Sequence, residues 1–459
     1  MFAPDDTIVA VATPPGRGGL GVVRLSGPEA QTLATRLLDH SEPLRARHAT
    51  VSRIVDASTP AGNAIDQVVA TSFPGPGSYT GDDVVEISAH GSPVLLERIV
   101  ALACAGGARL AEPGEFTLRA YLNGRLDLVQ AEAVADLVDA VTPLQARVAF
   151  DQLEGTVTQA IGAIDTDLFD LIARLEASLD FPNEGYHFVE PGTVAQGIGL
   201  LRDRVLGLLA GSSRGRLIRE GCHVVILGKP NVGKSSVFNS LVGSSRAIVT
   251  AVAGTTRDLV SDVIDLDGVA VTLVDSAGIR VTDDAVEAEG VARARQALAV
   301  ASSVVVVLDR SAGLEEEDRS VLEATAGSSR VVALNKIDVA SPSAWPREAL
   351  DLPPETSVVE VSARTGQGLD MLRSAVRAGL VGEEVYRDTP TVGNQRHIGL
   401  LERASGALAD AQRVTQDGAT EEFVLADLQR ARTAFEELTG ARTPDDVVNH
   451  IFERFCIGK

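Results

Sequence analysis

The sequence predicts a multidomain protein with an α+β N-terminal domain, an all-α helical domain, and an α/β domain inserted into the helical one. Three observations lead to this prediction. Over the first 120 residues, short β-branched runs alternate with glycine- and proline-rich turns. Apolar residues then follow helical spacing up to about residue 220, and again from about residue 395. Between these helical regions, an apolar strand runs into a glycine-rich loop of the kind that surrounds phosphate groups.

Length and charge set the first limits. The chain has 459 residues, enough for about three domains, and 45% of them are hydrophobic, which is ample for sizeable cores. The net charge of −22 disfavours broad, non-specific binding to nucleic acid. The one basic cluster, formed by Arg45, Arg47, His48 and Arg53, is more typical of a solvated loop than of an RNA site.

The cysteines and the first residues indicate the compartment. Cys104, Cys222 and Cys456 are scattered, which favours a reducing compartment and argues against a disulfide framework or a zinc site. Asp5 and Asp6 precede any apolar run, so no signal peptide is expected, and no run approaches the ~18 apolar residues of a membrane span. We therefore expect a cytoplasmic protein without a membrane span.

Residues 1–120 are expected to form the α+β domain. Its glycine-rich turns carry or adjoin charged residues, because the first contains Arg17 and the second ends beside Glu86. The expected strands lie at 7–12, 21–25, 68–72 and 84–88, and the expected helices at 28–38 and 93–103.

The helical domain is expected in two parts, residues 121–220 and 381–459. In the last helix, Thr443 is the expected N-cap and Pro444 the first helical residue. Neither part has the pattern of a complete core, so we expect them to pack together around an insertion at 221–380. A separate small C-terminal domain is the alternative. The expected helices lie near 126–141, 161–179, 194–218, 395–415, 420–438 and 443–455.

The inserted domain begins with a phosphate-binding motif. The run His223–Leu227 predicts a buried strand, and Gly228–Ser235 fits G-x-x-x-x-G-K-[ST] before a helix. Glycines allow backbone N–H groups to surround phosphate oxygens, and the helix N-terminus adds the positive end of its dipole. Lys234 is expected to reach the β- and γ-phosphates, and Ser235 to bind Mg²⁺. A chance glycine-rich turn is the alternative, which the flanking strand and helix argue against.

Three further motifs, each after a β-rich run, indicate which nucleotide binds. Asp275–Gly278 fits D-x-x-G, in which the aspartate holds Mg²⁺ through water and the glycine N–H meets the γ-phosphate. Asn335–Asp338 fits N-K-x-D, and the backbone of Ser362–Arg364 can meet guanine O6. The Asp338 carboxylate can accept from guanine N1–H and N2–H₂, whereas adenine offers neither donor there. The sequence therefore predicts a GTPase domain.

Residues 250–257 are expected to complete the phosphate site. Thr256 is the expected second protein ligand of Mg²⁺ beside Ser235, and Arg257 is the nearest candidate for an arginine that offsets transition-state charge. Asn231, with backbone oxygens of the same segment, could instead hold a monovalent cation beside the phosphates. The cation ligands would be Asn231, Thr250, Val252 and Thr255. The residues expected to contact GTP are Asn231, Val232, Gly233, Lys234, Ser235, Ser236, Thr250, Ala251, Val252, Ala253, Gly254, Thr255, Thr256, Asp275, Ser276, Ala277, Gly278, Asn335, Lys336, Asp338, Ser362, Ala363 and Arg364.

Longer motifs along the whole chain resemble a single family. They are Thr7–Ala10, Ala12–Gly19, Ser78–Glu86, Pro113–Thr117, Leu126–Ala133 and Phe455–Lys459, the last of which ends in C-x-G-K. With a GTPase domain between the helical parts, the chain resembles the tRNA-modification GTPase family MnmE, also called TrmE.

The resemblance implies an N-terminal domain that binds 5-formyltetrahydrofolate as a one-carbon donor and forms a homodimer. It places folate contacts at Arg24, Glu86, Arg125 and Lys459, with Cys456 near the modification chemistry. Arg125 stands where the family has lysine, and its planar guanidinium differs from a lysine point charge. A flavoprotein partner, MnmG, is implied in a heterotetramer that acts on tRNA. Together the two proteins would build an aminomethyl-type group on C5 of the wobble uridine.

The resemblance also implies how GTP is hydrolysed. Ile279 stands where Ras-like GTPases carry a water-orienting glutamine, and an aliphatic side chain cannot hydrogen-bond to water. By resemblance, Glu287 orients or activates the water, potassium occupies the cation site, and face-to-face pairing of two GTPase domains orders the segment 250–255. The alternative is a ribosome-assembly or signalling GTPase whose flanking domains only bind partners. The acidic charge and the C-x-G-K end favour tRNA modification.

Overall fold

The structure, a computed structural model, contains two compact units. One unit consists of residues 1–135, 150–203 and 400–459, and the other of residues 136–149 and 204–399. No helix among the described residues is long and apolar enough to cross a membrane. The structure describes residues 6–40, 42–56, 63–180, 191–244, 260–275, 301–339, 350–381, 390–418 and 420–459.

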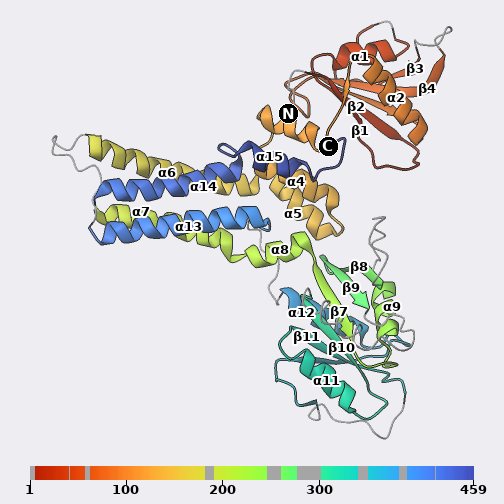
Figure 1. Ribbon diagram of the computed structural model, residues 1–459, viewed down its shortest axis with the longest axis vertical. Helices are drawn as coiled ribbons and strands as arrows, with labels where there is room; N and C mark the ends of the chain where they lie inside the picture. The colour runs from red at the N-terminus through yellow and green to blue at the C-terminus, as the bar shows by residue number, and fades with distance from the viewer. Residues whose placement is uncertain are drawn as a thin grey trace. The chain divides into compact units, whose positions relative to one another are not determined.

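A six-stranded sheet organises the N-terminal part of the first unit. Its elements are β1 Ile8–Val11, β2 Gly21–Ser26, α1 Ala30–Leu37, β3 Thr50–Val55, β4 Ala64–Phe73, β5 Val84–Ala89, α2 Pro93–Ala105, β6 Arg109–Leu110 and α3 Glu115–Leu122. The strand order is β3-β4-β5-β2-β1-β6, and only β1 and β6 pair in parallel. Apolar residues on one face pack against α1 and α2 (Figure 1). Alternate residues, including Arg24 and Glu86, point to the opposite face.

Helices from both sides of the α/β domain pack together in the first unit. They are α4 Leu128–Asp139, α6 Thr156–Asp180, α7 Pro191–Ala210, α13 Gln395–Gln416, α14 Glu421–Thr439 and α15 Asp445–Phe452. α5 Pro143–Leu153 follows α4 in the chain, and its residues 143–149 belong to the second unit. α14 runs beside α6 (Figure 1), and the Arg432 guanidinium carbon lies 4.5 Å from the centroid of the Phe169 ring. α13 approaches α7 at Gly199, where an added Cβ would lie 3.1 Å from Gln412 Nε2. Buried leucines such as Leu168 and Leu428 fill the space between the helices.

Two helix boundaries differ from the sequence prediction. The predicted helix 194–218 is two helices, α7 and α8 (Ser212–Glu220), because the chain leaves the helix at Gly211. The last helix begins at Asp445, so the prediction of Thr443 as N-cap is wrong by one residue. Pro444, with extended backbone, occupies the N-cap position, and the Thr443 hydroxyl donates to Glu437 O at 3.0 Å.

The second unit is built on a second six-stranded sheet. Its elements are β7 Cys222–Leu227, α9 Lys234–Ser244, β8 Val260–Leu266, β9 Val269–Asp275, β10 Ser303–Asp309, α11 Glu316–Ala324, β11 Arg330–Asn335, β12 Ser357–Glu360 and α12 Leu369–Val381. The strand order is β12-β11-β10-β7-β9-β8, and every pair is parallel except β8 with β9. Its apolar core lies on both faces of the sheet, which is why the central strands are nearly continuous valine, isoleucine and leucine runs.

The segment 136–149 of the same unit contacts the turn between β8 and β9. Thr142 Oγ1 donates to Gly268 O at 2.7 Å. A Cβ added to Gly268 would lie 2.9 Å from Leu144 Cβ, so the two segments approach closely. Gly268 also donates its N–H to Asp265 Oδ1 at 2.6 Å and has φ of 97°, a conformation that favours glycine. The tip of the β8–β9 hairpin is therefore held by contacts with a segment far away in the sequence.

Candidate functional site

The carboxyl ends of the parallel strands bring the predicted nucleotide motifs to one edge of the second sheet. The loop 228–235 follows β7, Asp275 ends β9, and Asn335 ends β11. β7 lies between β10 and β9, so the strands that follow it in the chain are added on both of its sides. Ligands of open α/β sheets bind at such switch points, outside the carboxyl ends of the strands.

The backbone of the loop explains its glycines. Gly228 and Gly233 have φ of 154° and 97°. A Cβ added at Gly228 would lie 2.3 Å from Val307 O, and one at Gly233 would lie 2.3 Å from Asn335 Nδ2. Asn231 has φ of 65°, in the left-handed region that asparagine enters more readily than most residues. The loop therefore passes too close to β10 and β11 for any side chain at its two key glycines.

The Lys234 side chain spans this loop. Its Nζ donates to Gly228 O and to Lys229 O, each at 2.9 Å. Burial lowers the pKa of the Lys234 ammonium group, and Asp275 opposes that shift. Because charge-assisted bonds to phosphate are stronger than bonds to neutral carbonyls, the ammonium group is suited to exchange these partners for phosphate oxygens. Ser235, in the first turn of α9, is exposed beside it.

The N-K-x-D turn is hydrogen-bonded directly to the phosphate loop. Asn335 Nδ2 donates to Val232 O at 2.9 Å, and Lys336 Nζ donates to Asn231 O at 2.8 Å. Asn335 Oδ1 also accepts from Ala363 N at 3.1 Å. The N-K-x-D turn, the segment Ser362–Arg364 (together the two base motifs) and the phosphate loop are thus connected by hydrogen bonds.

Asp338 is oriented by the neighbouring motif. Ser362 Oγ donates to Asp338 Oδ1 at 2.7 Å, and Arg364 Nε lies 3.4 Å from Asp338 Oδ2. The Ser362 hydrogen bond holds the pKa of Asp338 below its usual value, so the side chain is ionised at neutral pH. An ionised carboxylate accepts from two donors, which is the pattern that the guanine edge presents.

Part of the predicted site lies outside the described residues. This holds for the predicted contacts at 250–257 and 276–278 and for Glu287. The described part contains the loop 228–235, Asp275 and both base motifs. Assignments in the other segments stay predictions.

In the first unit, Arg24 and Glu86 are cross-strand neighbours on β2 and β5. Arg24 Nη2 lies 2.8 Å from Glu86 Oε1. The Arg24 guanidinium carbon lies 5.3 Å from the centroid of the Tyr79 ring and 5.6 Å from that of the Phe116 ring. Arg24 Nη1 also donates to Gly458 O at 3.3 Å. Two predicted site residues and the last residues of this sequence therefore meet at one place.

The last four residues are held by backbone contacts. Ile457 forms a β-bridge with Pro113, and a Cβ added to Gly458 would lie 2.3 Å from Val11 O. A tail of this composition is ordinarily expected to be disordered. Close packing of Gly458, which has φ of 97°, against β1 explains why it is ordered here. Lys459 is half-buried beside it.

Two other predicted residues, Arg125 and Cys456, are exposed. Arg125 lies in the exposed turn between α3 and α4, where its backbone N–H donates to Ala120 O at 2.8 Å. Within the described ranges, the ion pair of Glu86 is with Arg24 and none links it to Arg125. The Cys456 side chain is exposed.

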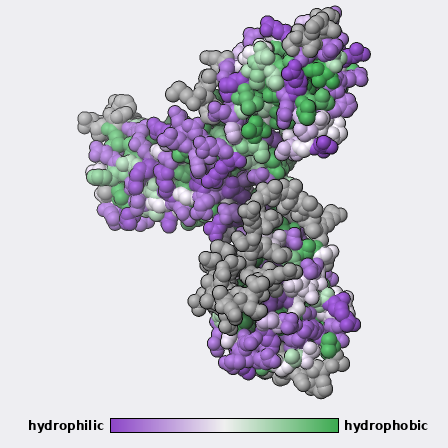
Figure 2. Space-filling view, turned by 45° about the vertical axis from the view of Figure 1, so that its right-hand side comes forward, coloured by the Kyte–Doolittle hydropathy of each residue, from purple (hydrophilic) through white to green (hydrophobic). Residues whose placement is uncertain are grey.

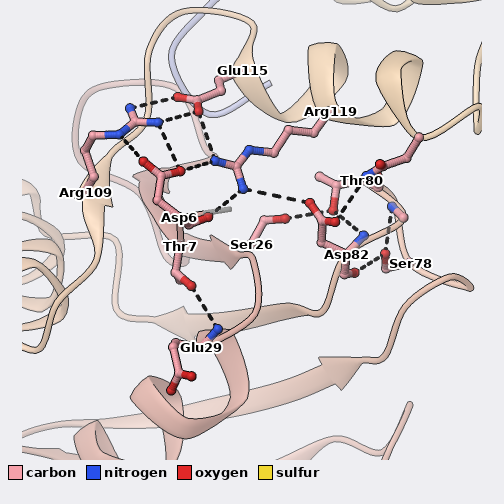
Figure 3. Close-up of polar contacts among 12 residues, drawn as sticks. Asp6, Thr7, Ser26, Glu29, Ser78, Thr80, Asp82, Arg109, Glu115 and Arg119 are labelled. Carbon is pink, nitrogen blue, oxygen red and sulfur yellow. Dashed lines mark hydrogen bonds and ion pairs between the residues drawn. The ribbon is translucent and has the colours of Figure 1, made fainter. Parts of the chain in front are cut away.

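A partly buried ion-pair network contacts the loop after β4 (Figure 3). Arg119 lies between three carboxylates, contacting Asp6 and Glu115 and lying 3.8 Å from Asp82 Oδ2. Arg109 pairs with two of them, at 2.7 Å from Asp6 Oδ2 and 2.6 Å from Glu115 Oε1. Burial raises the pKa of Asp82, and the Arg119 charge opposes this. The network joins the segment before β1, β6, α3 and the loop that carries Tyr79, whose ring lies beside Arg24.

Sequence reasoning missed three residues of these sites. Tyr79 and Phe116 lie in motifs that it singled out, but spacing does not show that their rings flank Arg24. Asp309 ends β10 and lies 2.6 Å from Lys336 Nζ. An aspartate directly after a run of buried valines is the signal that could have found it.

The strand order, the phosphate loop and the carboxylate of the N-K-x-D turn define a P-loop GTPase domain. A family model described as "GTP-binding protein TrmE N-terminus" matches residues 7–125, and one described as "MnmE helical domain" matches residues 128–456. The chain belongs to the MnmE family of tRNA modification GTPases.

Full-length relatives support this assignment. The chain is 44% identical over 459 residues to "tRNA modification GTPase MnmE" of Koribacter versatilis, with 99% of each chain covered. It is 44% identical over 460 residues to the protein of the same name from Symbiobacterium thermophilum, and the match covers 99% of this chain and 100% of the relative. For the Chloroflexus aurantiacus protein the identity is 43% over 457 residues, with the same coverage.

Proposed function

We propose that this protein is the GTP-hydrolysing component of a complex that modifies the wobble uridine of certain tRNAs. With the flavoprotein MnmG and 5-formyltetrahydrofolate as one-carbon donor, it would add an aminomethyl-type group to C5 of that base. The observation that carries the proposal beyond family membership is the Arg24–Glu86 pair, which lies beside two aromatic rings and the carbonyl of Gly458. Such a pair suits a ligand with a pterin edge and an anionic tail, because each charge can form a charge-assisted hydrogen bond.

In the GTPase domain, the proposed roles follow from the described contacts. Lys234 would bind the β- and γ-phosphates, and Asp338 would accept from the guanine edge. The Ser235 hydroxyl is a hard oxygen ligand of the kind that Mg²⁺ prefers, and Thr256 is proposed as the second such ligand. Mg²⁺ would neutralise charge on the phosphate oxygens. Glu287 is proposed to orient or activate the attacking water.

We also propose a homodimer, joined through the N-terminal domain, that assembles with MnmG into a heterotetramer. Apolar residues reach the surface of the N-terminal part on the face shown in Figure 2. Val51 and Val69 are cross-strand neighbours on the sheet face opposite α1 and α2, and they are 65% and 37% exposed. Adjacent exposed valines on an open sheet face support a protein–protein contact there.

The Glu86→Ala variant tests the folate part of the proposal. Removing one carboxylate of a charged pair is expected to weaken binding of 5-formyltetrahydrofolate by about tenfold or more. GTP hydrolysis should stay nearly unchanged, because Glu86 lies in the other unit. Titration calorimetry measures the folate affinity. Mass spectrometry of tRNA nucleosides, from cells in which the variant replaces the native protein, measures loss of the C5 group.

The matched control is Glu97→Ala, which removes an exposed carboxylate from α2 on the other side of the same sheet. It should retain both folate binding and tRNA modification. Unchanged folate affinity in Glu86→Ala would remove this residue from the site. A protein that binds no reduced folate and leaves tRNA unmodified would favour a ribosome-assembly or signalling role.

We propose that a potassium ion bound at Asn231 activates GTP hydrolysis. The Asn231 side chain is exposed at the phosphate loop, and its backbone carbonyl is already bonded to Lys336. The side-chain oxygen is thus the atom of this residue that would bind a cation, with oxygens of the segment 250–255. Turnover of GTP in KCl should exceed that in NaCl at equal ionic strength. Asn231→Ala should lose this advantage, on the order of 10²-fold for one group at developing charge.

The comparison also separates the two candidates for charge neutralisation. If the cation acts, Arg257→Ala should keep the difference between the two salts. Equal turnover in both salts for the unsubstituted protein would exclude the cation and make Arg257 the leading candidate. If the cation acts, paired GTPase domains should be needed, so turnover per molecule should rise with dimerisation of the GTPase domain.

A further inference from the structure

Asp309 lies beside the nucleotide site, next to Lys336. It is the last residue of β10, and the parallel register of β10 and β11 places it opposite Asn335. The next residue reinforces this register, because Arg310 N donates to Asn335 O at 2.8 Å. The carboxylate of Asp309 therefore lies at the start of the N-K-x-D turn, Asn335–Asp338, called the base-binding turn below.

The two oxygens of this carboxylate have different partners. Oδ1 accepts from Ser311 N at 2.9 Å and from Ser311 Oγ at 2.6 Å. Oδ2 lies 2.6 Å from Lys336 Nζ. The Asp309 side chain is 13% exposed, so water screens this pair less than it screens an ordinary surface pair. Ser311 fixes the rotation of the carboxylate, which leaves Oδ2 for the ammonium group.

Lys336 joins this carboxylate to the phosphate loop. Its Nζ donates both to Asp309 Oδ2 and to Asn231 O, and the adjacent Asn335 donates to the next carbonyl, that of Val232. Two consecutive carbonyls of the loop are thus held by two consecutive residues of the base-binding turn. Asn231 has positive φ, so its carbonyl direction depends on such contacts.

We propose that Asp309 is a positioning residue of the guanine-nucleotide site. It holds the Lys336 ammonium group against the Asn231 carbonyl, and so keeps the base-binding turn and the phosphate loop in one geometry. Asp309 does not touch the nucleotide in this arrangement and acts through Lys336. The inference rests on the proposed nucleotide site, and it adds a residue that joins the base half of that site to the phosphate half.

A double-substitution cycle tests the inference. Asp309→Asn leaves one acceptor oxygen for two sets of donors, so either Lys336 or Ser311 loses its partner. The GDP dissociation constant, measured by calorimetry with Mg²⁺, is expected to rise about tenfold. Lys336→Met, which keeps the aliphatic stem, should raise it at least as much. In the Lys336→Met background, Asp309→Asn should add less than about twofold, because residues that act through one contact are not additive.

Glu360→Gln is the matched control. Glu360 ends β12 at the same edge and pairs with Arg310 at 3.3 Å, but it contacts neither base motif nor phosphate loop among the described contacts. Its GDP affinity should equal that of the unsubstituted protein. Asp309→Glu, which keeps the charge, should recover part of the affinity lost in Asp309→Asn. A general loss of folding would instead lower the thermal midpoint in every background.

The outcomes separate this inference from the site on which it rests. If Lys336→Met weakens GDP binding and Asp309→Asn does not, Asp309 has no positioning role. Fully additive effects of the two substitutions would also overturn the inference. If Lys336→Met binds GDP like the unsubstituted protein, the proposed base site is wrong and the inference falls with it.

Discussion

Asp338→Asn is expected to change the base preference of the protein from guanine to xanthine. Guanine presents two donors, N1–H and N2–H₂, which suit the two oxygens of an ionised carboxylate. Xanthine presents N1–H and a carbonyl oxygen, which suit the oxygen and the amide N–H of asparagine. Ser362 already bonds one Asp338 oxygen at 2.7 Å, so the side chain is held in position for either pattern. The ratio of GTP to XTP affinity should fall by roughly 10⁴, as expected when a site built for hydrogen bonds meets an unmatched ligand.

Competition binding with GTP, XTP and ATP measures this change. Asp370→Asn is the control, because it makes the same chemical change at an exposed position in the first turn of α12. It should keep the preference for GTP. An Asp338→Asn variant that still prefers GTP to XTP by the original ratio would show that another group selects the base.

Glu287→Ala is expected to slow hydrolysis with little effect on nucleotide binding. The residue after D-x-x-G is Ile279, which cannot orient water, so the sequence requires another group for that role. Single-turnover hydrolysis should fall by roughly 10²–10⁴, the range for a lost general base or water-orienting residue. The dissociation constant for GTP should change only a few fold, because the carboxylate would contact water and not the nucleotide.

Two further variants serve as a control and as a test of the role of Glu287. Glu289→Ala removes the same charge two residues away and should hydrolyse GTP at the original rate. Glu287→Gln can still hydrogen-bond to water but cannot take its proton, so its rate separates orientation from base catalysis. If Glu287→Ala hydrolyses GTP normally in a single turnover, some other group orients the water.

The fold class is confirmed, and the reason is visible in the second sheet. Its central strands are buried on both faces, so they appear in the sequence as valine-rich runs that end at polar motifs. Other elements left no such signal. All of the first six residues of α3, Glu115–Ala120, are buried, so no polar face marks it as a helix. β8 carries aspartates and lies at the edge of its sheet, where a strand needs no continuous apolar run.

Sequence reasoning could predict the site residues that lie in local motifs, but not the contacts between distant segments. Motifs at the ends of parallel strands converge whatever the details of packing, so Lys234, Asn335 and Asp338 were accessible to sequence reasoning. Contacts that depend on register or on distant segments were not. Asp309 reaches Lys336 only because β10 and β11 pair in one particular register. The Arg24–Gly458 hydrogen bond joins residues 434 positions apart, and no local pattern encodes it.

The hairpin of β8 and β9 has a mechanical consequence. β9 has seven residues, so Asp275 and the turn at Gly268 lie about 20 Å apart at its opposite ends. An extended strand cannot lengthen much further. If β9 moved along its own axis, Asp275 and the turn at Gly268 would therefore move by nearly the same distance. The 2.7 Å bond from Thr142 to Gly268 is lost once the atoms separate by about 1 Å more. Asp275 and the contact with the segment 136–149 thus lie at opposite ends of one strand, so a shift of β9 against its neighbours would move both.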